Sequence, residues 1–254
     1  PVSNREVSTV LTDQQEPELV GAEYLGSYRV RLGLGQVRLE GFGHRLQLSA
    51  DERLVGLLDD EDPALRDRYG RHLWGQGCLL ARRLAEAGSA VINLYIDTPK
   101  TGPEFTNWDD HSGNAGREGH FAGFMQTRLP YLDQALATLI EDIFERGLDR
   151  RILVVVVGEF GRTPRIANNS LGTGRDHWPD AYSALVSGGG LRMGQVVGAT
   201  NSKAEYPTEN PLTPYDLLAT IYRHLEIDTQ LSLPDFAGRP IPILNDGAPI
   251  HALM

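Results

Sequence analysis

The sequence predicts an α/β fold with a mainly parallel sheet, and two observations lead to this prediction. Residues 152–157 are six consecutive apolar residues, mostly β-branched, which is typical of a strand buried on both faces. A second apolar strand at residues 90–96 precedes a helical segment whose apolar stripe runs through residues 132–144. The order strand, helix, strand is that of a βαβ unit, which joins parallel strands by a right-handed crossover.

The other elements follow from local signals. Residues 28–48 alternate partly between apolar and polar side chains, which indicates a small β region. Helical spacing of apolar residues begins at Pro63 and ends before Gly88, a suitable C-cap. Residues 182–187 are typical of a further strand, and a short strand is expected around residues 195–197.

The last helix is the best signalled element, since Thr213 is a good N-cap and Pro214 suits the first helical position. The tail at residues 233–240 is rich in turn residues. We expect residues 1–60 to be a poorly defined amino-terminal or insert region. Residues 61–254 then form the α/β domain.

Composition excludes several classes of partner. The 254 residues carry 24 Lys and Arg against 34 Asp and Glu, a formal charge of −10. This balance argues against a nucleic-acid surface and against docking on anionic lipid. No apolar run approaches the length of a membrane span. Cys78 is the only cysteine, so no intrachain disulfide forms, while compartment, localisation and oligomeric state are left open.

Polar side chains with metal-binding chemistry lie in the loops that follow the predicted strands. If the sheet is parallel, these loops meet at its carboxyl edge, where ligands of α/β proteins bind. Carboxylate oxygens mixed with imidazole nitrogens suit Zn²⁺, Mn²⁺ or a similar divalent ion. The candidate ligands are Asp109, His111, Glu159, Asp176 and His177.

Arg162 and Arg175 are candidates for binding an oxyanion, because a guanidinium fork matches phosphate or sulfate oxygens. Each group also has a purely structural interpretation. Asp109 could hold its loop by hydrogen bonds to the backbone, and Glu159 could form an ordinary salt bridge with Arg162. The Asp-His pair at residues 176–177 could be a surface turn.

Three motifs resemble a known family. They are Gly-Glu-Phe-Gly-Arg-Thr-Pro at residues 158–164, Gly-Arg-Asp-His-Trp-Pro at 174–179 and Trp-Asp-x-His-x-x-Asn at 108–114. Together they are similar to the hallmark motifs of a large uncharacterised bacterial family in the alkaline-phosphatase-like superfamily, often labelled sulfatase-like. The resemblance is strong over residues 64–254.

The resemblance implies a three-layer α/β/α fold of the alkaline-phosphatase-like type, with a divalent metal (Zn²⁺, Mn²⁺ or Ca²⁺) at the carboxyl edge of the sheet. It also implies hydrolysis of a phosphate or sulfate ester, either a small molecule or a polysaccharide. By position, Asp109 and His111 resemble one metal-binding pair, and His177 resembles a later single histidine ligand. Phe160 stands where relatives carry a ligand histidine, which puts one metal site in doubt.

The nucleophile of the superfamily has no match. Relatives begin with a strand that ends in an Asp ligand and is followed by Ser, Thr or Cys, and the nearest segment, residues 7–13, is short and poorly apolar. We therefore expect this chain to lack the amino-terminal strand segment of the fold. Two functions fit the sequence: a metal-dependent phosphate or sulfate ester hydrolase domain, inactive where the nucleophile is missing, and a non-catalytic binding or accessory domain.

Overall fold

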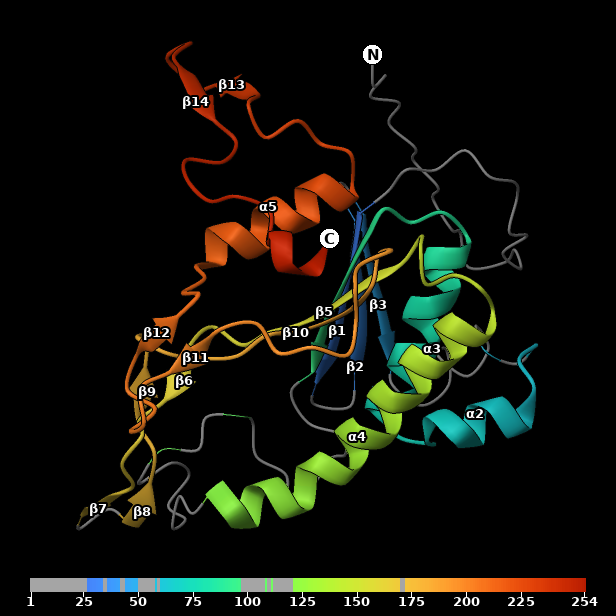
Figure 1. Cartoon of the computed structure of the whole chain (residues 1–254). Coiled ribbons are helices and arrows are strands. Elements are labelled where there is room, and N and C mark those ends of the chain that lie inside the picture. Colours follow the sequence, from blue (N-terminus) through green and yellow to red (C-terminus); the bar gives the residue numbers. More distant parts are fainter. Residues whose placement is uncertain are drawn as a thin grey trace. The chain divides into compact units, whose positions relative to one another are not determined.

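The computed structural model describes residues 27–33, 36–41, 44–49, 58, 60–96, 108, 111, 121–169 and 172–254. The chain divides into two compact units. The first comprises Pro1–Trp108 with Met125–Leu139, and the second comprises Asp109–Phe124 with Ile140–Met254. The long helix α4, Phe121–Glu145, is labelled in Figure 1. Its residues are divided between the two units.

The first unit holds a four-stranded sheet in the order β3-β2-β1-β4. The strands β1, β2 and β3 form an antiparallel meander, and β4 lies parallel to β1. The meander confirms the small β region expected in residues 28–48. The four strands are Ser27–Gly33, Gln36–Gly41, His44–Ser49 and Val91–Ile96.

Two helices replace the single helix expected after Pro63: α2, Pro63–Tyr69, and α3, Leu73–Glu86. The chain breaks at Gly70, whose φ of 93° lies in the left-handed region that glycine tolerates. The imidazole of His72 then caps α3 by accepting a hydrogen bond from the backbone N–H of Gly75, at 3.3 Å. Periodicity alone did not reveal the break, because the apolar stripe continues across it.

Apolar side chains from α2, α3 and α4 form the core of the first unit. Thr138 on α4 donates a hydrogen bond to the backbone oxygen of Arg68, 2.9 Å away, which ties α4 to the end of α2. Burial raises the pKa of the Cys78 thiol to about 12, so this side chain behaves as a small hydrophobe. The buried apolar residues of the unit are Leu58, Tyr69, Trp74, Cys78, Leu79, Leu80, Ala135 and Leu139.

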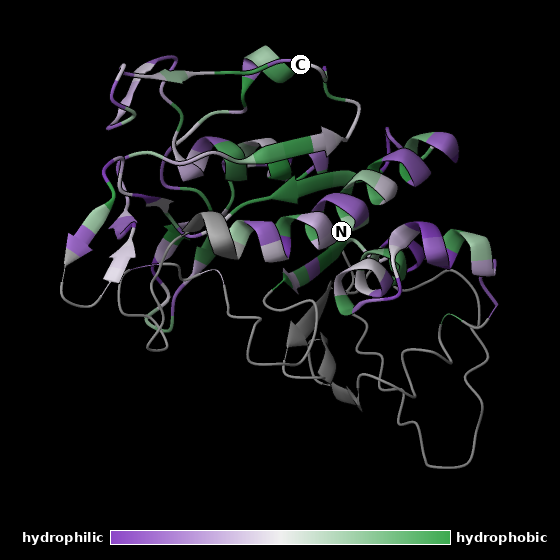
Figure 2. Cartoon of the chain, turned by 90° about the horizontal axis from the view of Figure 1, so that it is seen from below, coloured by the Kyte–Doolittle hydropathy of each residue, from purple (hydrophilic) through white to green (hydrophobic). Residues whose placement is uncertain are grey.

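The described residues of the second unit form five antiparallel pairs of short strands. In the longest pair β5, Leu153–Val156, lies against β10, Leu185–Gly188, and Figure 2 shows the strongly hydrophobic run that contains β5 in green. The other pairs are β6 (Gly161–Arg162) with β9 (His177–Trp178), β7 (Ala167–Asn169) with β8 (Gly172–Gly174), β11 (Ala199–Thr200) with β12 (Pro207–Glu209), and β13 (Ser232–Pro234) with β14 (Pro240–Pro242).

Helix α5, Pro214–His224, begins as the sequence predicts. Thr213 and Asp216 form a capping box, in which each side chain bonds the backbone N–H of the other residue. Asp216 also accepts a hydrogen bond from the backbone N–H of Ala248, at 2.9 Å, which ties the carboxyl-terminal segment to the start of α5. A 3-10 helix, His251–Leu253, follows that segment.

The prediction of a mainly parallel sheet in a three-layer α/β/α fold is wrong. The described residues form four α-helices, and only β1 with β4 pair in parallel. β5 was expected to be buried on both faces and parallel to the preceding strand, but it is half-buried along its length and pairs antiparallel with β10. A run of apolar β-branched residues encodes a strand and some burial, but neither the partner nor the direction of pairing. None of the described helices is long and apolar enough to cross a membrane.

Candidate metal and oxyanion site

Two of the predicted site residues, Arg162 and His177, lie on the two-stranded ribbon of β6 and β9, in the second unit. Arg162 on β6 lies directly opposite His177 on β9, and Gly161 lies opposite Trp178. Because side chains alternate along a strand, Arg162 and His177 share one face of the ribbon and Trp178 lies on the other. The motifs at residues 158–164 and 174–179 are therefore two halves of one structure.

The two arginines hold this ribbon together. Arg162 donates from Nη1 to the backbone oxygen of Arg175, at 3.2 Å. Arg175 donates from Nε to the backbone oxygen of Thr163, at 2.5 Å, and from Nη2 to that of Arg162, at 3.4 Å. Thr163 and Asp176 also pair through their backbones, since the N–H of Thr163 lies 2.9 Å from the oxygen of Asp176. Both guanidiniums thus have a structural role beside their charge.

Three rings meet next to the arginines. The imidazoles of His111 and His177 lie edge to face, with 5.7 Å between their ring centroids. The ring of Phe160 lies 4.2 Å from that of His177, tilted by 34°. The guanidinium carbon of Arg162 lies over the ring of Phe160, 5.9 Å from its centroid. His111 and His177 therefore lie close together, while Asp109, one of the ligands expected beside them, lies outside the described residues.

The spacing of the two imidazoles fits a shared metal ion. Ligand nitrogens lie about 2 Å from Zn²⁺, so two imidazoles on one tetrahedral ion have centroids about 5 Å apart. The observed separation of the two centroids, 5.7 Å, is close to that value. His177 is exposed and His111 is half-buried, so an ion can reach the pair from solvent.

The remaining predicted ligands do not complete a metal-binding group within the described part of the chain. Glu159 and Asp176 are both exposed. No set of three or more His, Cys, Asp or Glu side chains among the described residues is arranged to hold a metal. Asp109, two residues before His111, lies outside the described residues, as does the segment at residues 7–13.

Two anchoring residues escaped the sequence analysis. The indole Nε1–H of Trp178 donates to the backbone oxygen of Glu205, at 2.6 Å, on the face opposite His177. A Cβ built on Gly161 would lie 2.0 Å from the backbone oxygen of Ala181, so only glycine fits there. Only an alternation of side chains around Arg162 could have indicated this ribbon in the sequence. A strand of two residues is too short for such an alternation to be recognised.

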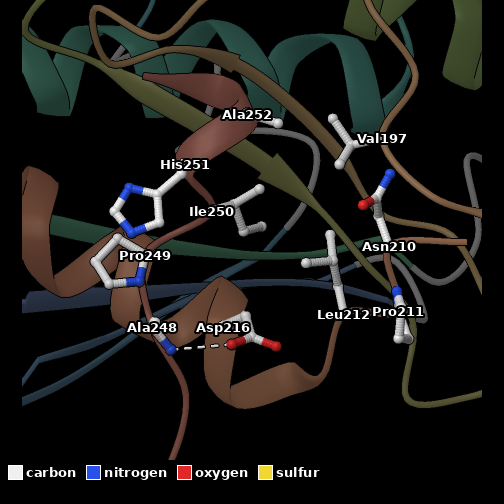
Figure 3. A pocket seen from close by; sticks show the side chains of 10 residues that line it. All are labelled: Val197, Asn210, Pro211, Leu212, Asp216, Ala248, Pro249, Ile250, His251 and Ala252. Carbon is white, nitrogen blue, oxygen red and sulfur yellow. Dashed lines mark hydrogen bonds between the residues drawn. The ribbon is translucent and has the colours of Figure 1, made fainter.

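A separate cavity of about 320 Å³ lies between the carboxyl-terminal segment and the start of α5 (Figure 3). None of the predicted site residues lines it. Asp216 points into it, but both of its carboxylate oxygens already accept hydrogen bonds, from Ala248 and from Thr213. This cavity therefore stays distinct from the β6–β9 site.

Comparison with known proteins gives one match. Residues 37–254 match the family described as "Protein of unknown function (DUF1501)". No curated protein and no solved structure matches the chain significantly. A function is therefore inferred from the residues of the β6–β9 ribbon.

Proposed function

We propose that this chain, which belongs to the DUF1501 family of proteins of unknown function, is the metal- and oxyanion-binding domain of an ester hydrolase of the phosphatase or sulfatase type. The resemblance of its motifs to the alkaline-phosphatase-like superfamily is part of this proposal. The observation that carries it is the meeting of His111 and His177 beside two arginines on one ribbon.

In this function His111 and His177 hold a divalent ion, with Asp109, Glu159 and Asp176 as the candidates for further ligands. A bound ion polarises an oxygen of the ester and stabilises the charge that develops on it. Arg162 and Arg175 keep their charge at any physiological pH and attract an anionic ester to the ribbon. Their bonds to backbone oxygens hold both guanidiniums in fixed orientations, which lowers the entropy cost of binding.

A second candidate function is a non-catalytic binding or accessory domain. It is favoured by the same arginine bonds, because guanidiniums that bind backbone oxygens of their own ribbon stabilise structure without any substrate. Hydrolysis also requires a nucleophile, and no residue has been assigned that role. Both candidates share metal and oxyanion binding, and they differ in turnover.

Calorimetric titration tests the metal and oxyanion binding that both candidate functions share. The protein is titrated first with Zn²⁺ and Mn²⁺, and the metal-loaded protein is then titrated with inorganic phosphate and sulfate. We expect one ion per chain and an oxyanion that binds only after the ion. His177→Ala should abolish both steps, while His251→Ala, an exposed histidine in the same unit, should leave both unchanged. Equal metal binding by the two variants would refute the proposed site.

A further inference from the structure

The ring of Phe160 lies close to two groups of the proposed site. His177 lies 4.2 Å from it, ring to ring, and the guanidinium carbon of Arg162 lies 5.9 Å from its centroid. Phe160 directly precedes β6, on which Arg162 lies opposite His177, and its ring contacts both of these side chains. Phe160 has no polar atom and cannot bind an ion or an ester oxygen itself.

Neighbouring rings can limit the rotation of the His177 side chain. His177 lies on a strand of two residues and is exposed to solvent. Two rings lie against the imidazole: that of Phe160, 4.2 Å away and tilted by 34°, and that of His111, which meets it edge to face. An aromatic ring is rigid and offers a flat surface, which a flexible aliphatic side chain does not.

We propose that Phe160 is a positioning residue: its ring, which lies against the imidazole of His177 at a tilt of 34°, holds that imidazole beside His111 so that both imidazoles can bind one ion. This inference rests on the proposed function, because the ion is part of it. Residues that orient metal ligands without touching the metal commonly alter metal affinity by about 10-fold to 100-fold. They do so by fixing the geometry of the ligand before the ion arrives.

Three variants test the proposal by Zn²⁺ titration calorimetry. Phe160→Leu keeps an apolar side chain but loses the flat ring, and we expect its dissociation constant to rise about 10-fold. Phe160→Tyr keeps the ring and should stay within about 3-fold of the wild type. Phe236→Leu makes the same chemical change at a fully exposed position of the same unit, and it should have no effect.

NMR of the metal-free protein supplies a second readout. Wild type and Phe160→Tyr should show nuclear Overhauser contacts between ring 160 and the His177 imidazole, together with contacts between His111 and His177. Phe160→Leu should lose the latter as His177 reorients. If the wild type binds Zn²⁺ and Phe160→Leu binds it equally well, the positioning role is refuted while the proposed function stands. If the wild type binds no divalent ion, both are refuted.

Discussion

The imidazoles of His111 and His177 lie 5.7 Å apart although 65 positions separate them in the chain numbering, and they meet edge to face. If they share one ion, removing either should remove the same binding energy. We expect Zn²⁺ at 100 times its dissociation constant to stabilise the wild type by about 2.7 kcal/mol. In His111→Ala, in His177→Ala and in the double variant, that stabilisation should be lost to the same extent.

Thermal melts with Zn²⁺ and with EDTA measure this effect as a double-mutant cycle. Non-additive losses are the signature of residues that act as one unit. Two independent losses that add would contradict a shared ion and assign the two histidines to separate sites.

Gly161 gives a sharp test of the ribbon. A Cβ there would lie 2.0 Å from the backbone oxygen of Ala181, so β6 must shift to accept Gly161→Ala. We expect a loss of about 2 kcal/mol in the free energy of unfolding, measured by urea denaturation. Gly158→Ala is the matched control: its nearest contact is 3.8 Å, and the change should stay within about 0.5 kcal/mol. Equal stability of the two variants would show that the close approach is absent.

Arg175 is a second point at which the ribbon can be tested. Its guanidinium donates to the backbone oxygens of Thr163 and Arg162, a fork that a lysine ammonium cannot reproduce. Arg175→Lys keeps the charge and should cost about 1 kcal/mol of stability, reported by chemical denaturation. Arg223→Lys, at an exposed arginine of the same unit, is the control and should be close to neutral. If both substitutions are neutral, the fork contributes no stability.

Asp216 predicts a dependence of stability on pH. The backbone N–H of Ala248, followed by the bonds from Thr213, lowers the pKa of its carboxyl below the ordinary value of 3.8. A depressed folded-state pKa means that the stabilisation is complete above 3.8 and is lost as pH falls through the lowered value. Asp216→Asn has one acceptor oxygen instead of two, and should lose about 1 kcal/mol at pH 7.

Urea denaturation of the wild type and of Asp216→Asn at pH 7, 4, 3 and 2 should show the two stabilities converging towards the acid end. Asp180→Asn, which removes an exposed carboxylate in the same unit, controls for the change in net charge. A difference that stays constant down to pH 2 would contradict the assignment.

Local signals in the sequence were reliable, and non-local pairings were not. Thr213, Pro214 and Asp216 lie within four residues and carry the whole start of α5, which the structure confirms. The apolar run at residues 152–157 does form a strand, β5. Its partner β10 lies far along the chain, and nothing within an apolar run specifies which strand it meets or in which direction. The parallel sheet was therefore a wrong extension of a correct local prediction.

The candidate site shows the same difference between local signals and non-local contacts. The sequence offered Arg162 and His177 as candidates for one site, and the pairing of β6 with β9 places them opposite each other. The imidazole of His111 lies 5.7 Å from that of His177, and the metal-binding role of both stays a proposal. The contact of Phe160 with His177 depends on a pairing of two residues on each strand, which is too short to leave a periodic pattern.

Turnover separates the two candidate functions. Hydrolysis needs a nucleophile beside the ion, and covalent catalysis and electrostatic stabilisation act as a unit, so binding groups alone give little rate. We expect residues 1–254 to bind a divalent ion but to show no appreciable turnover of 4-nitrophenyl phosphate or 4-nitrophenyl sulfate with Zn²⁺, Mn²⁺, Mg²⁺ or Ca²⁺. Release of 4-nitrophenol, followed by absorbance with and without EDTA, is the measurement. Robust metal-dependent turnover that His177→Ala abolishes and His251→Ala preserves would overturn this expectation. It would also mean that the chain holds a nucleophile, either a side chain or an activated water, which further substitutions among the polar residues near His177 could then identify.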